Sequence, residues 1–420
     1  MVRYHLETYG CTSNRGESRE IERALRDGGH RPAAGPEEAD VAILNTCTVV
    51  EKTERNMLRR ARQLEEETPA DLVITGCMAL AQGEAFREAG VDAEILHWDD
   101  VPEHVLNGEC PTATADTDPV LDGVVGVLPI ARGCMSDCSY CITKRATGRI
   151  DSPPVEENVE KARALVHAGA TEIRVTGQDT GVYGWDRNRG TSLLPDLLER
   201  ICAIEGDFRV RVGMANPKGV HGVRERLARV FAENDELYNF LHAPVQSGSD
   251  DVLADMRRQH SVGEYVEVVE TFDAHLDYWT LATDFVAGFP TETDRDHEQS
   301  LALLEETSPE KINITRFSKR PGTDAAGMKG LGGTIKKERS KGLTDVKMEV
   351  VGAAHEAMVG RESEVLVVED GTDDSMVGYD RAYRQVAIPG AERAGVELGD
   401  VVDVEITGHN TVYALGELVA

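Results

Sequence analysis

Three cysteines lie close together in the segment ARGCMSDCSYC, where Cys134, Cys138 and Cys141 have the spacing C-x3-C-x2-C. Three thiolates at such a spacing suit a cubic 4Fe–4S cluster, and no fourth cysteine follows at a matching distance. Three ligands on four irons leave one iron open, much as a catalytic metal site keeps one position free. The segment therefore predicts a cluster whose open iron chelates the amino and carboxylate groups of a substrate.

A structural zinc site without its fourth ligand is the alternative interpretation of this loop. The loop follows an apolar strand and opens a long series of alternating strands and helices, whereas zinc modules are small. This context favours the iron–sulfur cluster.

A second set of cysteines is spread along the first part of the chain: Cys11 in TYGCTSN, Cys47 in LNTCTV and Cys77 in ITGCMA. Each follows an apolar run typical of a buried strand. Ligands bind at the carboxyl edge of open α/β sheets, so we expect these cysteines to converge there as a second three-cysteine site. Three buried cysteines that behave as small hydrophobic residues are the alternative. Cys110 and Cys202 belong to no motif, and we treat both as incidental.

Alternating strands and helices must position the first three cysteines. Apolar strands are expected at residues 2–10, 40–47 and 71–77. Amphipathic or charged helices are expected at residues 17–29 and 53–67. This alternation predicts a parallel sheet covered by helices over residues 1–110, followed by a linker at residues 111–122.

The alternation resumes after the linker and becomes regular. Strands are expected at residues 124–133, 172–177, 208–215, 238–246, 279–289 and 311–317, with helical segments between them. Such repeats predict an α/β fold with a partial (β/α)6 barrel over residues 123–355, whose catalytic groups lie at the carboxyl ends of the strands.

The pattern changes again near the C-terminus. A long helical stretch at residues 336–359 precedes short alternating segments separated by turns rich in Gly, Asp and Asn. Residues 356–420 are therefore expected to form a small antiparallel β-barrel, a fold that often binds single-stranded nucleic acid.

The chain is strongly acidic, with a net charge of −30 and acidic residues in every region. Only 11 of its 45 basic residues are lysine. This composition resembles that of proteins from a salt-loaded cytoplasm, where salt screens repulsion between carboxylates; an acidic protein of an ordinary cytoplasm is the alternative. A negative net charge normally argues against a nucleic-acid partner, but that argument is weak in an acidic proteome.

The sequence predicts a cytoplasmic protein without a membrane partner. No apolar run approaches the roughly 18–20 residues of a membrane span, and the first residues lack the apolar core of a signal peptide. In such a protein, clustered cysteines favour metal binding or catalysis over disulfides.

The chain resembles the radical S-adenosylmethionine (SAM) superfamily, in which C-x3-C-x2-C follows the first barrel strand as it does here. The resemblance implies that the open iron binds the methionine part of SAM, and that one electron then cleaves the sulfonium to give a 5′-deoxyadenosyl radical. TGQD at residues 176–179, by itself ordinary turn chemistry, matches the strand end that meets the amino group of SAM in that superfamily. HAPVQSGSD, DFVAGFPTET and TRFSKRPGT match later strand ends in order. The SAM contacts implied by this resemblance are Tyr140, Thr176, Gly177, Gln178, Gln246, Gly288 and Phe289.

The motifs YGC, NTC and TGCM resemble the methylthiotransferase family within this superfamily. The resemblance implies a second 4Fe–4S cluster on Cys11, Cys47 and Cys77, whose open iron carries the sulfur that is methylated and inserted. It also implies that the terminal barrel is an RNA-binding TRAM-type domain.

Within that family, ETYGCTSNRGES and NTCTVVEKTERNM look most like the archaeal and eukaryotic branch, which acts on tRNA. The implied activity converts N6-threonylcarbamoyladenosine beside the anticodon into its 2-methylthio derivative and consumes two SAM molecules. The implied partners are the tRNA anticodon stem-loop and a ferredoxin- or flavodoxin-like electron donor.

Other substrates and classes stay open at this point. The same chemistry could act on an aspartate of a ribosomal protein or on isopentenyladenosine in tRNA, and a non-enzymatic iron–sulfur scaffold that binds RNA is a further alternative. The segment from Glu356 onward has 14 acidic and 4 basic residues, which suits a basic protein target. By contrast, Arg316, Lys319 and Arg320 form a basic cluster that faces either phosphates or solvent.

Overall fold

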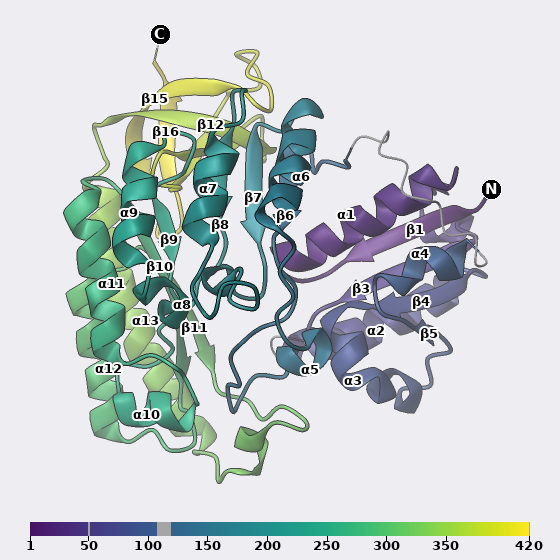
Figure 1. Cartoon of the computed structure of the whole chain (residues 1–420), viewed down its shortest axis with the longest axis horizontal. Helices are drawn as coiled ribbons and strands as arrows, with labels where there is room; N and C mark the ends of the chain where they lie inside the picture. The colour runs from purple at the N-terminus through teal and green to yellow at the C-terminus, as the bar shows by residue number, and fades with distance from the viewer. Residues whose placement is uncertain (49–50, 107–118, 420) are drawn as a thin grey trace.

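The computed structural model describes residues 1–48, 51–106 and 119–419, so Cys110 and most of the expected linker lie outside the described residues. Figure 1 shows an N-terminal α/β domain beside a larger central barrel, with a small β-barrel at one end of the latter. Each of these parts corresponds to a region of distinct periodicity in the sequence.

The N-terminal domain is built on a parallel sheet with the strand order β2-β1-β3-β4-β5. Its strands are β1 (Arg3–Thr8), β2 (Arg31–Pro32), β3 (Val41–Thr46), β4 (Asp71–Thr75) and β5 (Glu94–Ile95). Its helices are α1 (Thr12–Asp27), α2 (Glu51–Glu67), α3 (Gly76–Glu88) and α4 (Asp100–Val105), with a 3-10 turn at Pro36–Glu38. Every residue of β3 is buried, which explains why this central strand is an almost continuous apolar run. The expected parallel sheet is confirmed.

The central domain is the expected partial βα barrel. Its parallel strands are β6 (Val125–Pro129), β7 (Glu172–Thr176), β8 (Arg209–Val212), β9 (Phe240–His242), β10 (Thr280–Ala287) and β11 (Lys311–Arg316). Strands β6 to β8 and β9 to β11 form two sheets joined by a parallel bridge between Val210 and Leu237.

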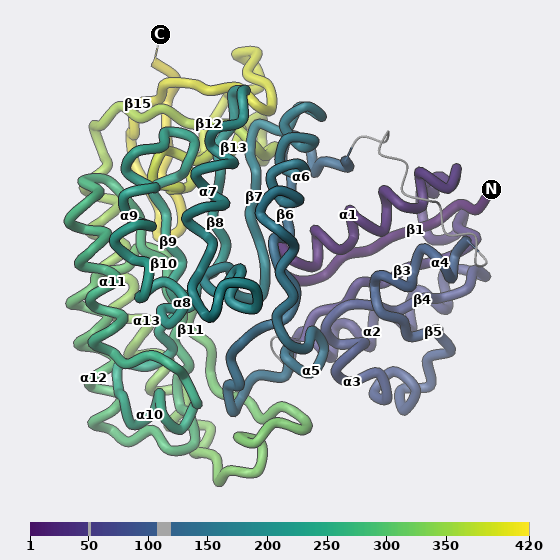
Figure 2. The backbone as a smooth tube through the Cα atoms, viewed as in Figure 1, coloured from purple at the N-terminus to yellow at the C-terminus, as the bar shows by residue number. Residues whose placement is uncertain are grey.

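Most helices of this domain cover the outer face of these strands, as Figures 1 and 2 show, whereas the short helix at Thr143–Thr147 packs against α3 of the N-terminal domain. The helices of this domain are α5 (Thr143–Thr147), α6 (Val155–His167), α7 (Leu194–Cys202), α8 (Pro217–His221), α9 (Arg224–Glu233), α10 (Asp250–Asp255), α11 (Val262–His275), α12 (Asp294–Thr307) and α13 (Gly333–Glu356), with 3-10 turns at Thr180–Val182 and Asp324–Gly327. The helical segment between β9 and β10 is divided into α10 and α11. The helix breaks because Arg257 has a positive φ of 56° and Ser261 begins a new helix through a capping box with Glu264.

The terminal domain is a closed barrel with the order β12-β13-β14-β16-β15. Its strands are β12 (Glu362–Asp370), β13 (Met376–Asp380), β14 (Gln385–Ile388), β15 (Val401–His409) and β16 (Ala414–Leu418). The expectation of a wholly antiparallel barrel is corrected at one pair, because β14 and β16 run parallel. A ring of five strands, as the described residues form it, cannot alternate in direction at every pair, so one parallel pair is unavoidable.

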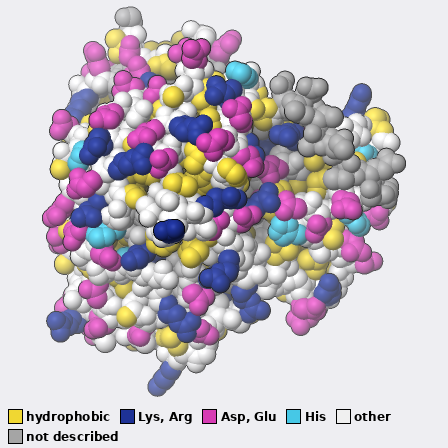
Figure 3. All heavy atoms as spheres, viewed as in Figure 1, with side chains coloured by type: hydrophobic (Ala, Val, Ile, Leu, Met, Phe, Trp, Pro, Cys, Tyr) yellow, Lys and Arg dark blue, Asp and Glu magenta, His cyan; other side chains and the backbone are white. Residues whose placement is uncertain are grey.

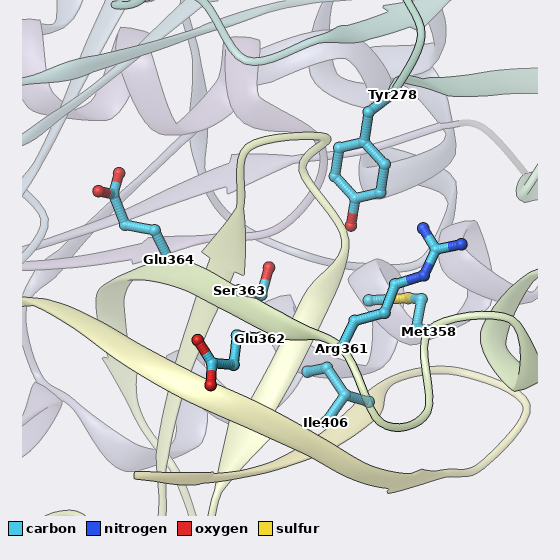
Figure 4. A pocket seen from close by; sticks show the side chains of 7 residues that line it. All are labelled: Tyr278, Met358, Arg361, Glu362, Ser363, Glu364 and Ile406. Atoms are coloured by element: carbon cyan, nitrogen blue, oxygen red, sulfur yellow. The ribbon is translucent and has the colours of Figure 1, made fainter. Parts of the chain in front are cut away.

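This terminal barrel closes the amino-terminal end of the central barrel. Leu366 and Val368 pack with Val125 and Phe240, which begin or lie in central-barrel strands, and Tyr383 joins the same cluster. A cavity of about 310 Å³ lies at this junction. Figure 4 shows the side chains that line it: Tyr278, Met358, Arg361, Glu362, Ser363, Glu364 and Ile406. None of these residues belongs to the predicted chemistry, which lies at the opposite ends of the strands.

The N-terminal domain packs tightly on the central barrel through α1. A side chain at Gly16 would bring its Cβ within 2.7 Å of Pro129 Cγ, so only glycine lets α1 approach β6 this closely. Arg132 pairs with Asp99 at 2.9 Å, and its guanidinium lies 3.9 Å above the ring centre of Trp98. These contacts fix the position of the carboxyl edge of the N-terminal sheet relative to the carboxyl ends of the central-barrel strands.

We expect Gly16→Ala to destabilise the chain by about 1–3 kcal/mol, because the rigid Pro129 ring cannot move aside without shifting the backbone. Gly352→Ala in α13 is the matched control, since no atom lies within 4 Å of its added Cβ. It should stabilise the helix by roughly 0.5–1 kcal/mol. Denaturant unfolding of both variants measures the difference, and equal effects would show that the α1–β6 contact is not tight.

Candidate functional site

The carboxyl ends of the N-terminal sheet and of the central barrel open on one cavity of about 550 Å³. All of the predicted cluster ligands line this cavity: Cys11, Cys47, Cys77, Cys134, Cys138 and Cys141. The predicted SAM contacts that also line it are Tyr140, Thr176, Gly177, Gln178 and Gln246. The fold thus brings together two cysteine sets that come from different domains.

Gly288 and Phe289, the remaining predicted SAM contacts, do not line the cavity. Phe289 is fully buried and packs edge-on against Tyr140, with the ring centres 6.4 Å apart. Gly288 has a φ of 74° and donates its N–H to the Glu292 carboxylate at 2.7 Å. Phe289 therefore lies behind Tyr140, and the Gly288–Glu292 hydrogen bond holds the turn that carries Phe289.

Each cysteine of the first set lies just beyond a strand. Cys11 caps the N-terminus of α1, Cys47 directly follows β3, and Cys77 lies in the first turn of α3. The preceding glycines are required by sterics and by backbone conformation. Gly76 has a φ of 86°, and a Cβ there would lie 2.2 Å from Asn45 Oδ1; Gly10 has a φ of 133°. This explains the glycine in both YGC and TGC.

A buried amide network ties these three loops together. The Asn45 side chain donates to the Asn14 carbonyl at 2.9 Å and to Ser18 Oγ at 3.0 Å, and its Oδ1 accepts from Asn14 Nδ2 at 2.9 Å. The Cys11 thiol donates to Asn14 Oδ1 at 3.4 Å, while Thr46 Oγ1 donates to the Thr75 carbonyl at 2.5 Å. The asparagine and threonine of the NTC motif therefore fix the loops that carry Cys11 and Cys77.

The loop of the second set is anchored to its surroundings. Gly133 has a φ of 71°, and a Cβ there would lie 2.1 Å from the Arg149 carbonyl. Gly133 donates its N–H to Gln178 Oε1 at 3.1 Å, so Gln178 positions the cysteine loop as well as lining the cavity. Ser139 is clamped to the loop after α10 by hydrogen bonds to the Met256 carbonyl at 3.0 Å and the Asp255 carbonyl at 2.8 Å.

Hydrogen bonds also reach the sulfur atoms. The backbone N–H of Ser136 donates to Cys134 Sγ at 3.3 Å, and the buried guanidinium of Arg258 donates to Cys138 Sγ at 3.6 Å. Such donors stabilise a thiolate, which is the form of cysteine that binds metal.

Burial opposes that thiolate form. Burial and the neighbouring Asp179 carboxylate raise the pKa of Cys134 to about 11. Burial, Glu17 and the other cavity thiols, Cys141 of the second set included, raise the pKa of Cys77 well above its usual value. Three adjacent thiolates thus need a positively charged partner in the cavity, and an iron–sulfur cluster meets that need.

Two sets of three cysteine thiols line the cavity, and this is the donor set that a 4Fe–4S cluster with one open iron requires. Within the described ranges, no group of three or more His, Cys, Asp or Glu side chains converges closely enough to hold one metal ion.

Several cavity residues fall outside the motif-based prediction. Arg211, His242, Asp284 and Asn313 line the cavity from the neighbouring strands β8, β9, β10 and β11. Asp284 accepts from His242 Nε2 at 3.1 Å and from Asn313 Nδ2 at 2.8 Å. Their positions in expected barrel strands could have indicated that they line the cavity. Arg258 lies in a loop between two helices, and no sequence pattern indicates its role.

Asp179, the last residue of TGQD, is also part of this site. Its buried carboxylate accepts the backbone N–H groups of Asn216 at 2.9 Å and Gly181 at 3.1 Å. Burial raises its pKa to about 6 in spite of these hydrogen bonds. The carboxylate therefore holds the turn after β7 in place at the edge of the cavity.

Arg320 does not belong to a phosphate-facing cluster. Its side chain is buried, pairs with Glu54 at 2.9 Å and donates to the Thr48 carbonyl at 3.0 Å. Arg316 and Lys319 are exposed. The predicted basic cluster is thus corrected, because Arg320 joins the barrel to the N-terminal domain.

Sequence profiles of three families match the chain. The radical SAM superfamily matches residues 128–304, "Uncharacterized protein family UPF0004" matches residues 3–96, and the TRAM domain matches residues 356–419. Together these matches cover each part of the fold described above.

Full-length relatives share one name. A probable threonylcarbamoyladenosine tRNA methylthiotransferase of Archaeoglobus fulgidus is 37% identical over 100% of this chain and 99% of its own length. That of Methanothermobacter thermautotrophicus is 34% identical over 99% of both chains. The threonylcarbamoyladenosine tRNA methylthiotransferase of Homo sapiens is 30% identical over 99% of this chain and 74% of its own.

Solved structures share the fold at low sequence identity. The radical SAM methyltransferase TsrM of Kitasatospora setae, solved with cobalamin and a 4Fe–4S cluster, has a TM-score of 0.58 at 12% identity, over 78% of this chain and 77% of its own. The cobalamin-dependent SAM radical enzyme OxsB has a TM-score of 0.53 at 12% identity, over 84% of this chain and 56% of its own.

We expect Asn45→Ala to lower the free energy of unfolding by about 1–3 kcal/mol, because it leaves buried partners on Asn14 and Ser18 unsatisfied. After reconstitution, bound iron should fall toward the amount that Cys134, Cys138 and Cys141 hold alone. Asn188→Ala is the control: Asn188 is exposed and makes one long hydrogen bond of 3.4 Å, so its loss should change stability by less than about 0.5 kcal/mol. Unchanged iron in Asn45→Ala would contradict a role of the network in placing the first cysteine set.

Proposed function

The chain belongs to the family of threonylcarbamoyladenosine tRNA methylthiotransferases, and from this we propose that it converts N6-threonylcarbamoyladenosine in tRNA to its 2-methylthio derivative. The resemblance inferred from the cysteine motifs is confirmed by relatives 30–37% identical over nearly the whole chain. The radical SAM match supports an enzyme, so the non-enzymatic scaffold is set aside.

One observation carries this proposal: both cysteine sets open on the same cavity. Methylthiolation must bring together a centre that activates a carbon and a centre that delivers sulfur. A single cavity between two domains provides both centres with one substrate position, whereas separate cavities would not.

The two sets of three cysteines indicate which cofactors the chain would hold. We propose that Cys134, Cys138 and Cys141 hold one 4Fe–4S cluster, with SAM beside it, and that Cys11, Cys47 and Cys77 hold the other. When bound, these groups supply one-electron chemistry and a sulfur atom for a carbon that acid–base groups cannot activate.

The protein's own contribution is placement and exclusion of water. Gln178 and Ser139 hold the second cysteine loop in position, and Arg258 directs a positive charge at Cys138. We propose that Tyr140, Thr176, Gly177, Gln178 and Gln246 contact SAM, and that Phe289 acts indirectly by supporting Tyr140, with Gly288 holding the turn before it.

The substrate must enter from a single-stranded loop, because the C2 edge of a paired and stacked adenine is not accessible. Strands β8 to β11 each present a polar side chain to the cavity, Arg211, His242, Asp284 and Asn313. These polar groups suit the carboxylate and hydroxyl of a threonylcarbamoyl substituent, which can hydrogen-bond to them, better than an apolar isopentenyl group, which cannot.

The remaining parts of the proposal concern organisation and partners. We propose an auxiliary-cluster domain at residues 1–110, a linker at 111–122, a radical SAM core at 123–355 and a TRAM-type barrel at 356–420. We further propose the anticodon stem-loop as the RNA partner, a ferredoxin- or flavodoxin-like electron donor and a cytoplasmic location. Among the helices of the described ranges, none has the length and apolar character to span a membrane.

Mass spectrometry of nucleosides from total tRNA, with and without the gene, tests the proposal. We expect deletion to remove the methylthio group from threonylcarbamoyladenosine and to leave the unmodified nucleoside in its place. Unchanged tRNA would overturn the proposed substrate, and a ribosomal protein would then be examined by the same method.

We expect Cys47→Ala to retain SAM cleavage but to lose methylthiolation by more than about 100-fold, because only the first cysteine set is broken. Cys134→Ala should lose both activities. Cys202→Ala is the control: this cysteine is buried in α7, outside the cavity, and its variant should retain both activities. Methylthiolation that persists in Cys47→Ala would refute the assignment of two clusters.

A further inference from the structure

The segment from residue 316 to residue 341 has a charge opposite to that of the whole chain. It contains eight basic and two acidic residues, although the net charge of the chain is −30. Figure 3 shows acidic side chains spread over the visible face, with Lys and Arg among them. A strongly basic segment is therefore an exception in this protein and calls for a physical explanation.

Two of the eight basic side chains are buried and pair with acidic residues. Arg320 pairs with Glu54, and Arg339 is buried and pairs with Glu292 at 2.9 Å. The others lie at least partly at the surface: Arg316, Lys319, Lys329, Lys336, Lys337 and Lys341.

Part of this segment forms a groove of about 480 Å³, which we call the basic groove. Its lining residues are Lys52, Arg55, Ile314, Thr315, Arg316, Phe317, Ser318, Gly333 and Lys336. Four of them are cationic, and none of the described residues that line it is acidic. The cations come from the start of α2, the end of β11 and the start of α13, so both domains contribute to the groove.

The basic groove and the cysteine cavity are lined by residues that are close in sequence, both on β11 and at the start of α2. Asn313 lines the cavity, and Thr315, two residues further on and so on the same face of β11, lines the groove. Thr48 lines the cavity, and Lys52 lies four residues further on. A strand that passes through the groove would therefore be close to the site of chemistry.

A buried ion pair holds the two sides of the groove together. Arg320, in the loop after β11, pairs with Glu54 of α2 at 2.9 Å and donates to the Thr48 carbonyl at 3.0 Å. Because Lys52 and Arg55 flank Glu54, this pair fixes the cations of α2 relative to Arg316. The groove is thus formed before any partner binds, which reduces the entropy cost of binding.

We propose, on the basis of the function above, that the basic groove binds backbone phosphates of the RNA strand that carries the modified adenosine. Phosphates are the anions that clustered Lys and Arg side chains recognise without reading sequence. A basic protein partner would be repelled by four cations. Phosphates on one side of the adenosine would lie in the groove while the base enters the cavity.

The terminal barrel does not provide an equivalent site near the chemistry. From Glu356 onward it has 14 acidic and 4 basic residues, and it packs against the amino-terminal ends of the barrel strands. Figure 1 shows it at the end of the central barrel away from α5, which follows the second cysteine loop. The groove, and not this barrel, holds the phosphates nearest the modified nucleoside.

The test is binding of a threonylcarbamoylated anticodon stem-loop to reconstituted protein over a series of KCl concentrations. The double variant Lys52→Gln/Arg316→Gln should bind about tenfold more weakly, and the slope of log K against log salt should fall by roughly 0.7 for each phosphate that the protein no longer neutralises. Both side chains are exposed, so thermal unfolding should not change. The double variant Lys52→Arg/Arg316→Lys, which keeps both charges, should restore the slope.

Two variants serve as controls. Arg229→Gln removes an exposed cation from α9, on the outer face of the central barrel, and should leave binding and slope unchanged. Arg393→Gln removes an exposed cation of the terminal domain that pairs with Asp374. A reduced slope in Arg393→Gln together with an unchanged slope in Lys52→Gln/Arg316→Gln would overturn the proposal and assign phosphate binding to the terminal barrel.

The same samples separate this proposal from the proposed function. If the wild-type protein methylthiolates the stem-loop and the groove variant keeps the full salt slope, the groove proposal is wrong and the function stands. If no methylthiolated nucleoside forms while the groove variant has a reduced slope, the groove is an RNA site and the proposed function is wrong.

Discussion

Six thiols from two domains share one cavity. The electrostatic cost of ionising these thiols there, so that they can bind metal, is the constraint on which the rest of the structure depends. Burial raises the pKa of Cys77 and of Cys134, so the thiolates that bind metal are disfavoured until a positive centre is present. The protein reduces this cost with donors such as Arg258, which points at Cys138 Sγ from 3.6 Å. Loops that were free to move would separate the thiolates as they ionise, and the three ligands would no longer face one cluster. The cavity therefore requires rigid surroundings, and the structure supplies them.

That rigidity comes from buried polar groups and from close backbone packing, since five of the six cysteines lie outside helices and strands and Cys77 lies only in the first turn of α3. The hydrogen bonds between Asn14, in the first turn of α1, and Asn45, near the end of β3, join the segments that carry Cys11 and Cys47. At the domain boundary, Gly16 allows α1 to contact β6 directly, and the Arg320–Glu54 pair joins the loop after β11 to α2. An ion pair this deeply buried contributes little net stability, but it penalises any arrangement in which one partner is left alone. The N-terminal sheet and the central barrel thus have one favourable relative position.

Much of this architecture can be predicted from the sequence, because the hydrophobic patterns of strands and helices are visible in short segments of the chain. Apolar runs and amphipathic stretches predict parallel strands and covering helices, and the rule that ligands bind at carboxyl edges predicts that Cys11, Cys47 and Cys77 converge. Long-range packing is not encoded in any short window. Phe289 matched a motif for contact with SAM but lies behind Tyr140, and the cation of Arg320 is used between domains. The parallel β14–β16 pair follows from closing a ring, which no single strand reveals.

The net charge of the chain and the local charge of the basic groove lead to different predictions about RNA binding. A net charge of −30 describes the average surface, and an average says nothing about a local field whose range is about one Debye length, roughly 8–10 Å at moderate salt. Four cations on the groove beside the cavity can therefore attract a polyanion that the rest of the surface repels. Repulsion elsewhere has a benefit, because RNA that is held only near the cavity has fewer unproductive positions. An acidic terminal barrel is then consistent with an RNA substrate, since its packing role at the far end of the strands depends on Leu366, Val368 and Tyr383 and not on phosphate contacts.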